Sequence, residues 1–177
     1  MLYLINAKIA PMFAFFQKLF QPKKPNAAIA WQQAGNQAGG AYWLYAAPVH
    51  LVLQRDTFSL AEPVPMALNQ QESDALTSAL NKYFAGDGIS FFWHENMWFL
   101  RLEQNPSIQT HAPQAALNKA VGAYLPTGDG AIAWASFTNE IQMLLFEHPI
   151  NQAREAKNLP AINSIWCYGL GQIEQVK

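Results

Sequence analysis

One helix has recognisable start and stop signals in the sequence, and it separates two segments rich in strand-forming residues. It is predicted to begin at Asn69, which can cap the helix while Glu72 reaches back to complete a capping box. It is predicted to end at Gly86-Asp87-Gly88, because glycine readily adopts the left-handed conformation that follows many helices. Between these points, apolar residues at helical spacing form one face: Leu76, Leu80, Tyr83 and Phe84.

Strands are predicted on both sides of this helix. Tyr42–Gln54 is rich in aromatic and β-branched residues, and its second half alternates apolar with other residues, as a half-buried strand does. We expect it to form a hairpin with residues 58–60. Ile89–Trp93 and Met97–Leu102 are predicted to form a second hairpin.

The second half of the chain is predicted to contain three helices and one strand. The helices are Pro113–Tyr124, the longer Gly130–Glu147, and a short helix over Asn151–Lys157 that Asn151 would cap. Pro149 is expected to end the longer helix, because a residue that precedes proline avoids the helical conformation. The final strand is predicted over Ala161–Tyr168.

This order of elements predicts an α+β fold. We expect a mostly antiparallel or mixed sheet of about five strands, with helices packed on one face. Residues 1–40 are expected to form an N-terminal helix and linker, residues 41–171 a single α+β domain, and residues 172–177 a polar tail.

The composition is that of a packed domain with few charges. Hydrophobic residues make up 51% of the 177 residues and charged residues 13%, which is about half the usual share. The surface is therefore covered by Gln, Asn, Ser and Thr, or part of it is covered by a partner. The net charge of −1 and the lack of a basic stripe argue against nucleic-acid binding, which requires several Lys and Arg on phosphates.

The N-terminal residues 1–20 are apolar, but Lys8 and Pro11 interrupt them, so we expect no membrane span there. Helical spacing of the Phe and Leu residues in this stretch is consistent with a helix that docks on the domain. An arm that packs on a partner or a membrane surface is the alternative. The single cysteine, Cys167, excludes a disulfide within the chain and fits a reducing cytoplasm.

No arrangement of residues predicts a catalytic or metal site. The histidines are scattered, without the spacing of zinc ligands: His50, His94, His111 and His148. Glu140 and Glu147 lie seven residues apart on a predicted helix, which is more typical of a solvated face than of an acid–base pair. We expect no metal and no cofactor.

The most informative stretch is residues 139–171, where polar side chains are set among apolar ones. Asn151 and Arg154 are one helical turn apart and share a face, and Asn163 lies where a strand is predicted. In a structural interpretation, Asn151 caps a helix, Arg154 pairs with a carboxylate and Asn163 bonds a neighbouring loop. In a functional one, these side chains line a pocket where Arg154 receives an anion.

The same stretch contains a motif with a known parallel. Its residues are His148-Pro149-Ile150-Asn151, Arg154, Leu159-Pro160-Ala161, Asn163, Trp166, Gly169 and Gly171. It resembles the segment that closes the smaller, inserted domain of archaeal-type cofactor-independent phosphoglycerate mutases. Those enzymes hold two metal ions and a serine nucleophile in a larger domain. We see no counterpart of that domain here, and because the chain ends soon after Gly171, we expect none to follow.

Residues 41–171 as a whole resemble a bacterial family of RpfE-type regulatory proteins, loosely called phosphoglycerate mutases. The resemblance rests on Pro48-Val49-His50, Glu72-Ser73, residues 139–145 and the C-terminal motif. It implies candidate ligand-binding residues and candidate structural residues. The first group is Asn151, Arg154, Asn163 and His148; the second is Asn139, Glu140, Gln142, Trp166 and Gly169.

Three functional hypotheses remain open. The first is a non-catalytic or regulatory domain that binds a small phosphorylated or carboxylate ligand, or a protein partner. The second is a mutase-like enzyme that needs a partner chain. The third is a structural interaction module that works through its Trp-rich surface and its N-terminal helix, with another protein or with a second copy of the chain.

Overall fold

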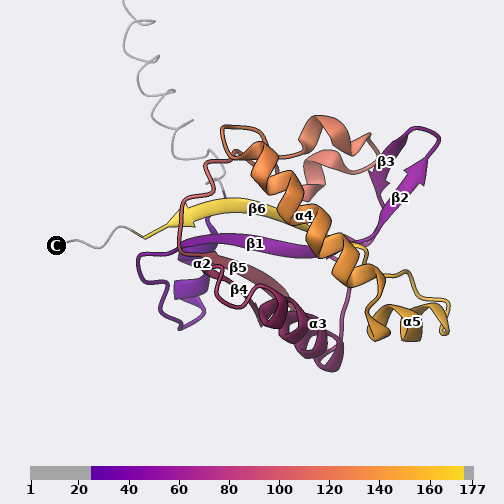
Figure 1. Cartoon of the computed structure of the whole chain (residues 1–177), viewed down its shortest axis with the longest axis horizontal. Coiled ribbons are helices and arrows are strands. Elements are labelled where there is room, and N and C mark those ends of the chain that lie inside the picture. Colours follow the sequence, from indigo (N-terminus) through magenta and orange to yellow (C-terminus); the bar gives the residue numbers. More distant parts are fainter. Residues whose placement is uncertain (1–24, 174–177) are drawn as a thin grey trace, which may run out of the picture.

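The fold is built on a four-stranded antiparallel sheet in the order β4-β5-β1-β6 (Figure 1). The computed structural model describes residues 25–173. The strands are β1 (Tyr42–Val49), β4 (Ile89–His94), β5 (Met97–Leu102) and β6 (Ser164–Gln172). Together with the helices packed beside this sheet, they confirm the predicted α+β class.

A separate two-stranded sheet projects from the end of β1. It consists of β2 (Leu51–Gln54) and β3 (Thr57–Leu60), which pair around a turn with Arg55 in the left-handed region. The prediction of one strand across Tyr42–Gln54 was wrong at His50. The His50 ring contacts the Ala161 carbonyl at 2.7 Å and its own carbonyl accepts from Ala61, so tertiary contacts end the strand there.

Helix α3 (Gln70–Tyr83) begins with the predicted capping box. The Asn69 side chain accepts from the Glu72 backbone amide at 2.9 Å, and the Glu72 carboxylate accepts from the Asn69 amide at 3.0 Å. Later in this helix, Asn81 bonds both the amide and the carbonyl of Phe91. Since β4 is an edge strand, α3 thereby satisfies backbone groups that would otherwise be exposed at that edge.

The second half differs from the prediction in its details. Helix α4 is Ala131–Phe146, close to the predicted range, and α5 is Pro149–Glu155. The predicted helix over Pro113–Tyr124 is two short 3₁₀ helices, η1 (Pro113–Ala116) and η2 (Val121–Tyr124). The chain is extended after each 3₁₀ turn and Asn118 between them is left-handed, so no continuous helix can form.

The two faces of the main sheet are covered by different elements. On one face, α3 and α4 pack over a cluster that includes Leu44, Phe91 and Leu100. On the other face, α2 (Ala27–Gln33) covers one end through Trp31, and η1, η2 and the β2–β3 hairpin cover the other end. The helix expected within residues 1–20 lies outside the described residues.

Trp31 anchors α2 to the sheet. Its ring stacks on Trp43 with centroids 4.8 Å apart and also contacts Phe92 and Phe99. The Gly169-x-Gly171 motif lets α2 approach β6: a Cβ on Gly169 would lie 2.9 Å from the Tyr45 ring and 3.0 Å from the Pro25 carbonyl oxygen. Gly169 also has a φ of +69°, which favours glycine.

We predict that Trp31→Ala destabilises the protein by about 3 kcal/mol, because it removes a buried aromatic side chain from a seven-residue helix with little stability of its own. Urea unfolding monitored by tryptophan fluorescence would measure the change. Ile29→Ala on the same helix is the matched control, since Ile29 is 47% exposed. Equal effects of the two substitutions would contradict the anchoring role of Trp31.

Candidate functional site

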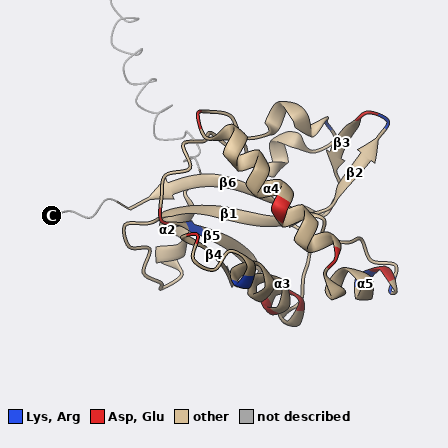
Figure 2. Cartoon of the chain, viewed as in Figure 1, with Lys and Arg blue, Asp and Glu red and all other residues tan. Residues whose placement is uncertain are grey.

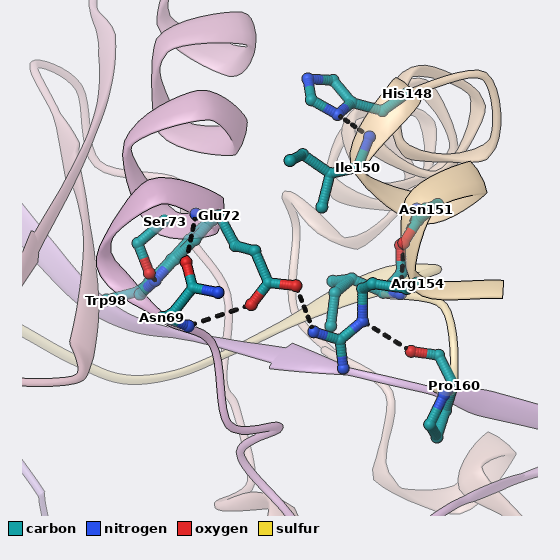
Figure 3. Close-up of polar contacts among 10 residues, drawn as sticks. Asn69, Glu72, Ser73, Trp98, His148, Ile150, Asn151, Arg154 and Pro160 are labelled. Carbon is teal, nitrogen blue, oxygen red and sulfur yellow. Dashed lines mark hydrogen bonds and ion pairs between the residues drawn. The ribbon is translucent and has the colours of Figure 1, made fainter. Parts of the chain in front are cut away.

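Arg154 and Glu72 form a buried ion pair between α5 and α3 (Figure 3). The Arg154 Nη1 atom lies 2.8 Å from the Glu72 Oε1 atom, and the two side chains are 6% and 14% exposed. The Arg154 Nε atom also donates to the Pro160 carbonyl at 2.8 Å. Two of the three guanidinium nitrogens are therefore bonded to the protein itself, and Arg154 pairs with a carboxylate as the structural interpretation proposed.

Asn151 lies beside this pair and is almost fully buried. Its amide nitrogen donates to the Leu145 carbonyl at the end of α4 and to the Ile162 carbonyl, and its oxygen accepts from the Ile162 amide. It ties the end of α4, the helix α5 and the start of β6 together. The expectation that Asn151 caps its own helix was wrong, because its side chain points to these neighbours instead.

His148 caps α5 in place of Asn151. Its Nδ1 atom accepts from the Ile150 amide at 3.2 Å, and Pro149 occupies the first helical position. Partial burial lowers the pKa of His148, because desolvation disfavours the charged ring. The neutral ring keeps the nitrogen lone pair that accepts this bond, so burial and capping favour the same protonation state.

Asn163 precedes β6 rather than lying within it. Its oxygen accepts from the Leu51 amide at 2.7 Å and its nitrogen donates to the Leu51 carbonyl at 2.8 Å. The side chain thus pairs with the backbone at the start of β2 as a neighbouring strand would. The ligand-binding role expected for Asn151, Arg154, Asn163 and His148 stays a prediction. Each of them forms hydrogen bonds within the protein.

The candidate structural residues divide between the interior and the surface. The Trp166 indole donates to the His111 carbonyl at 2.8 Å and holds the η1 region to β6. The Gln142 amide donates to the Ser164 hydroxyl at 3.2 Å. Asn139 and Glu140 are exposed on α4, and Asn139 and Gln142 line a groove beside that helix.

This groove has a volume of about 500 Å³, within the range of ligand pockets. Its walls come from α4, from the chain around η2 and from the β2–β3 hairpin. The lining is mostly apolar, with polar contributions from Thr138, Asn139, Gln142 and Asn163. The groove is thus adjacent to the Asn163 part of the motif but not to the buried ion pair.

The rim of the groove continues into an exposed apolar surface on α4. Ile132 is 85% exposed, Met143 72% and Phe146 81%. We call these three residues, together with Leu125, Phe58 and Leu53, the α4 surface. They account for six of the ten large apolar side chains that are exposed in residues 25–173. Such a concentration marks an interaction site more than scattered exposure does.

Sequence reasoning missed this surface, although a signal was present. Helix α4 carries apolar residues all round and one charged residue, Glu140. A helix of that kind is usually buried on all sides. In the structure its inner stripe of Trp134, Ile141 and Leu145 is buried, whereas residues 25–173 leave its outer stripe uncovered. Figure 2 shows how few charged residues lie along α4.

Other chemistry is sparse in the described residues. Between residues 25 and 173, no three His, Cys, Asp or Glu side chains are close enough to hold a metal ion. Burial raises the pKa of Cys167 to about 12, so its thiol is protonated at neutral pH. No helix in this part of the chain is long and apolar enough to cross a membrane.

The fold has a counterpart among solved structures. The chain matches no protein-family model and no curated protein sequence. It is similar to a cofactor-independent phosphoglycerate mutase from Thermoplasma acidophilum, with a TM-score of 0.55 and 16% identity. The match covers 77% of this chain and 38% of the mutase, so the chain spans less than half of that enzyme's length. At this identity the likeness shows the fold alone; membership of the RpfE-type family stays a prediction.

We predict that breaking the buried ion pair is costly. Glu72→Gln and Arg154→Met should each lower the free energy of unfolding by about 3 kcal/mol, since each leaves a buried charge or polar group without its partner. The double variant should lose much less than the sum of the two, because the lost interaction is shared. Chemical denaturation of the four proteins would measure this coupling.

The exposed pair Arg101–Glu103 is the matched control. Its atoms lie 3.4 Å apart and the side chains are 34% and 61% exposed. Arg101→Met should therefore cost less than about 1 kcal/mol. A similar cost for Arg101→Met and Arg154→Met would contradict a special role for the buried pair.

Proposed function

We propose that this protein is a non-catalytic docking domain that binds an apolar, uncharged surface of a partner protein through the α4 surface and its groove. The observation that supports this most strongly is the exposure of Ile132, Met143 and Phe146 along one side of a single helix. Burying such side chains on a partner is favourable by about 25 cal/mol for each Å² removed from water.

The expected location of the protein is the cytoplasm, as its single Cys167 suggests.

The chemistry of the groove defines the partner. Among residues 25–173, no Lys, Arg, Asp or Glu side chain lines it, and its polar contributions are hydroxyl and amide groups. An anionic ligand would find no cation there, and a strongly charged surface would lose its hydration without compensation. A partner with aromatic or aliphatic anchors and neutral hydrogen-bonding groups fits these walls.

The candidate anion site around Arg154 lacks the properties that binding requires. Arg154 is buried, at 5% exposed, and two of its nitrogens already bind the Glu72 carboxylate and the Pro160 carbonyl. An anion would have to enter this buried position beside the negative charge of Glu72, which would repel it. We therefore propose that Asn151, Arg154, His148 and Asn163 hold the fold together and that the α4 surface binds the partner.

A mutase-like enzyme completed by a partner chain is the alternative function. The fold likeness to part of a phosphoglycerate mutase favours it. Both functions need a docking surface on this domain, so the identity of the partner distinguishes them. A partner with a metal-binding, phosphatase-like site would favour the enzyme.

We predict that 3-phosphoglycerate and inorganic phosphate leave the melting temperature unchanged, because Arg154 is already paired. Differential scanning fluorimetry at several ligand concentrations would measure the melting temperature. The control ligand is chloride at matched ionic strength. A rise in the melting temperature that Arg154→Met removes, while Arg101→Met retains it, would instead place an anion at Arg154.

We predict that a photo-crosslinking amino acid at position 143 captures a partner in cells, whereas the same group at position 97 does not. Met97 is the matched control because it is also exposed, at 41%, but lies on β5 away from α4. Phe146→Asp should abolish the adduct formed from position 143. Gel electrophoresis and mass spectrometry would identify the adduct.

Folding must be intact for this comparison. Phe146 is 81% exposed, so Phe146→Asp should change the melting temperature little, and circular dichroism would verify this. Equal adducts from positions 143 and 97, or an adduct that persists in Phe146→Asp, would contradict docking through the α4 surface.

A further inference from the structure

We propose that the partner on the α4 surface is a second copy of this chain, with the two α4 helices packed antiparallel about a two-fold axis at Asn139. This inference rests on the docking function proposed above and names its partner. It follows from a pattern on the outer side of α4 that complements itself when the helix is reversed.

The outer stripe of α4 has a heptad spacing. Ile132, Asn139 and Phe146 follow one another at intervals of seven residues, and a helix brings residues seven apart to nearly the same side. All three are exposed, with Ile132 at 85% and Phe146 at 81%. The stripe therefore has an apolar residue at each end and an amide at its centre.

When two copies of α4 pack antiparallel, the stripes of the two helices complement each other. In an antiparallel pair centred on Asn139, each Ile132 faces the Phe146 of the other copy, and the two Asn139 side chains meet at the axis. An amide carries both a donor and an acceptor, so two amides can satisfy each other. A two-fold interface requires this kind of reciprocal contact.

The groove supplies a receptor for the anchor. Phe146, in the last turn of α4, is 81% exposed and lines one end of the groove, while Leu125, Pro126, Ala131 and Ala135 line the part near the first turns. The antiparallel pairing brings the Phe146 ring of one copy to that end of the other copy's groove. Each copy then contributes one aromatic anchor and one pocket, as energetically important interface residues commonly do.

Charge lies at the edge of this pairing and not within the stripe. Successive helix residues differ by about 100° around the axis, so Glu140 and Glu147 lie at the side of the stripe and not on it. The positions within about 60° of the stripe are uncharged: Ala135, Ser136, Gln142 and Met143. Two copies can therefore approach along the stripe without burying a charge.

The contact between the two helices is small. Helix α4 has 16 residues and is about 24 Å long, so the stripe alone is smaller than the roughly 800 Å² that a stable interface buries on each partner. The exposed Leu125 and Phe58, which line the groove, and Leu53, which pairs with Phe58 in the β2–β3 hairpin, must add to it. We accordingly expect a dimer of micromolar affinity.

Sedimentation equilibrium of the full chain over a concentration series tests the dimer. We expect a monomer–dimer equilibrium, at least a tenfold weaker dimer for Phe146→Asp, and no change for the control Met97→Asp. Circular dichroism would confirm that both variants fold. A monomer at millimolar concentration, or a dimer that Phe146→Asp does not weaken, would overturn the proposal.

Cysteine pairs test the orientation. Asn139→Cys should form a disulfide-linked dimer under mild oxidation, because residue 139 lies on the two-fold axis. Ile132→Cys alone should not, but a mixture of Ile132→Cys and Phe146→Cys should give the mixed dimer. The wild-type chain is the control, since its Cys167 is buried. Efficient self-linking of Ile132→Cys would indicate parallel helices and overturn the antiparallel arrangement.

The identity of the protein cross-linked at position 143 shows whether the dimer alone is wrong or the docking function as well. An adduct of twice the chain mass supports the second copy. An adduct with a different protein would keep the docking function and overturn the dimer. A cross-link to residues 1–24 of the same chain would overturn both, because that segment would then cover the α4 surface itself.

Discussion

The buried ion pair between Glu72 and Arg154 holds together segments that are 82 residues apart in sequence. Glu72 closes the capping box of α3 with one carboxylate oxygen and binds Arg154 with the other. Helix α5 has seven residues and cannot be stable alone. Its position depends on Arg154, on Asn151 and on the cap at His148. The end of α4, which carries the docking surface, is fixed through the same contacts.

Three asparagine side chains bond backbone groups of the fold in the same way. Asn81, Asn151 and Asn163 each donate to the carbonyl and accept from the amide of a single residue. An amide side chain can thereby replace a neighbouring strand where the main chain turns away from the sheet. Backbone groups must find partners when they are buried. This requirement explains why a chain with so few charges retains these polar residues in its interior.

The C-terminal half buries several polar residues and exposes several large apolar ones. Asn151 and Arg154 of the C-terminal motif are buried and bonded to other groups of the protein. The outer side of α4, in contrast, exposes Ile132, Met143 and Phe146. A surface of this kind costs solubility unless another surface covers it. The similarity to part of a longer mutase shows that the same fold occurs as a portion of a larger protein. We consider docking to be the function that this distribution supports best.

The sequence by itself determined the elements whose signals are local. The capping box of Asn69 and Glu72 involves residues three apart, and the strand pattern has a period of two, so α3 and the α+β class could be predicted. Only the tertiary structure decided the rest. It paired Arg154 with Glu72 and made His148 rather than Asn151 the cap of α5. Within residues 25–173, it also left one side of α4 uncovered. Each of these depends on which distant backbone or side-chain groups arrive at the same place, and residue spacing alone does not contain that information.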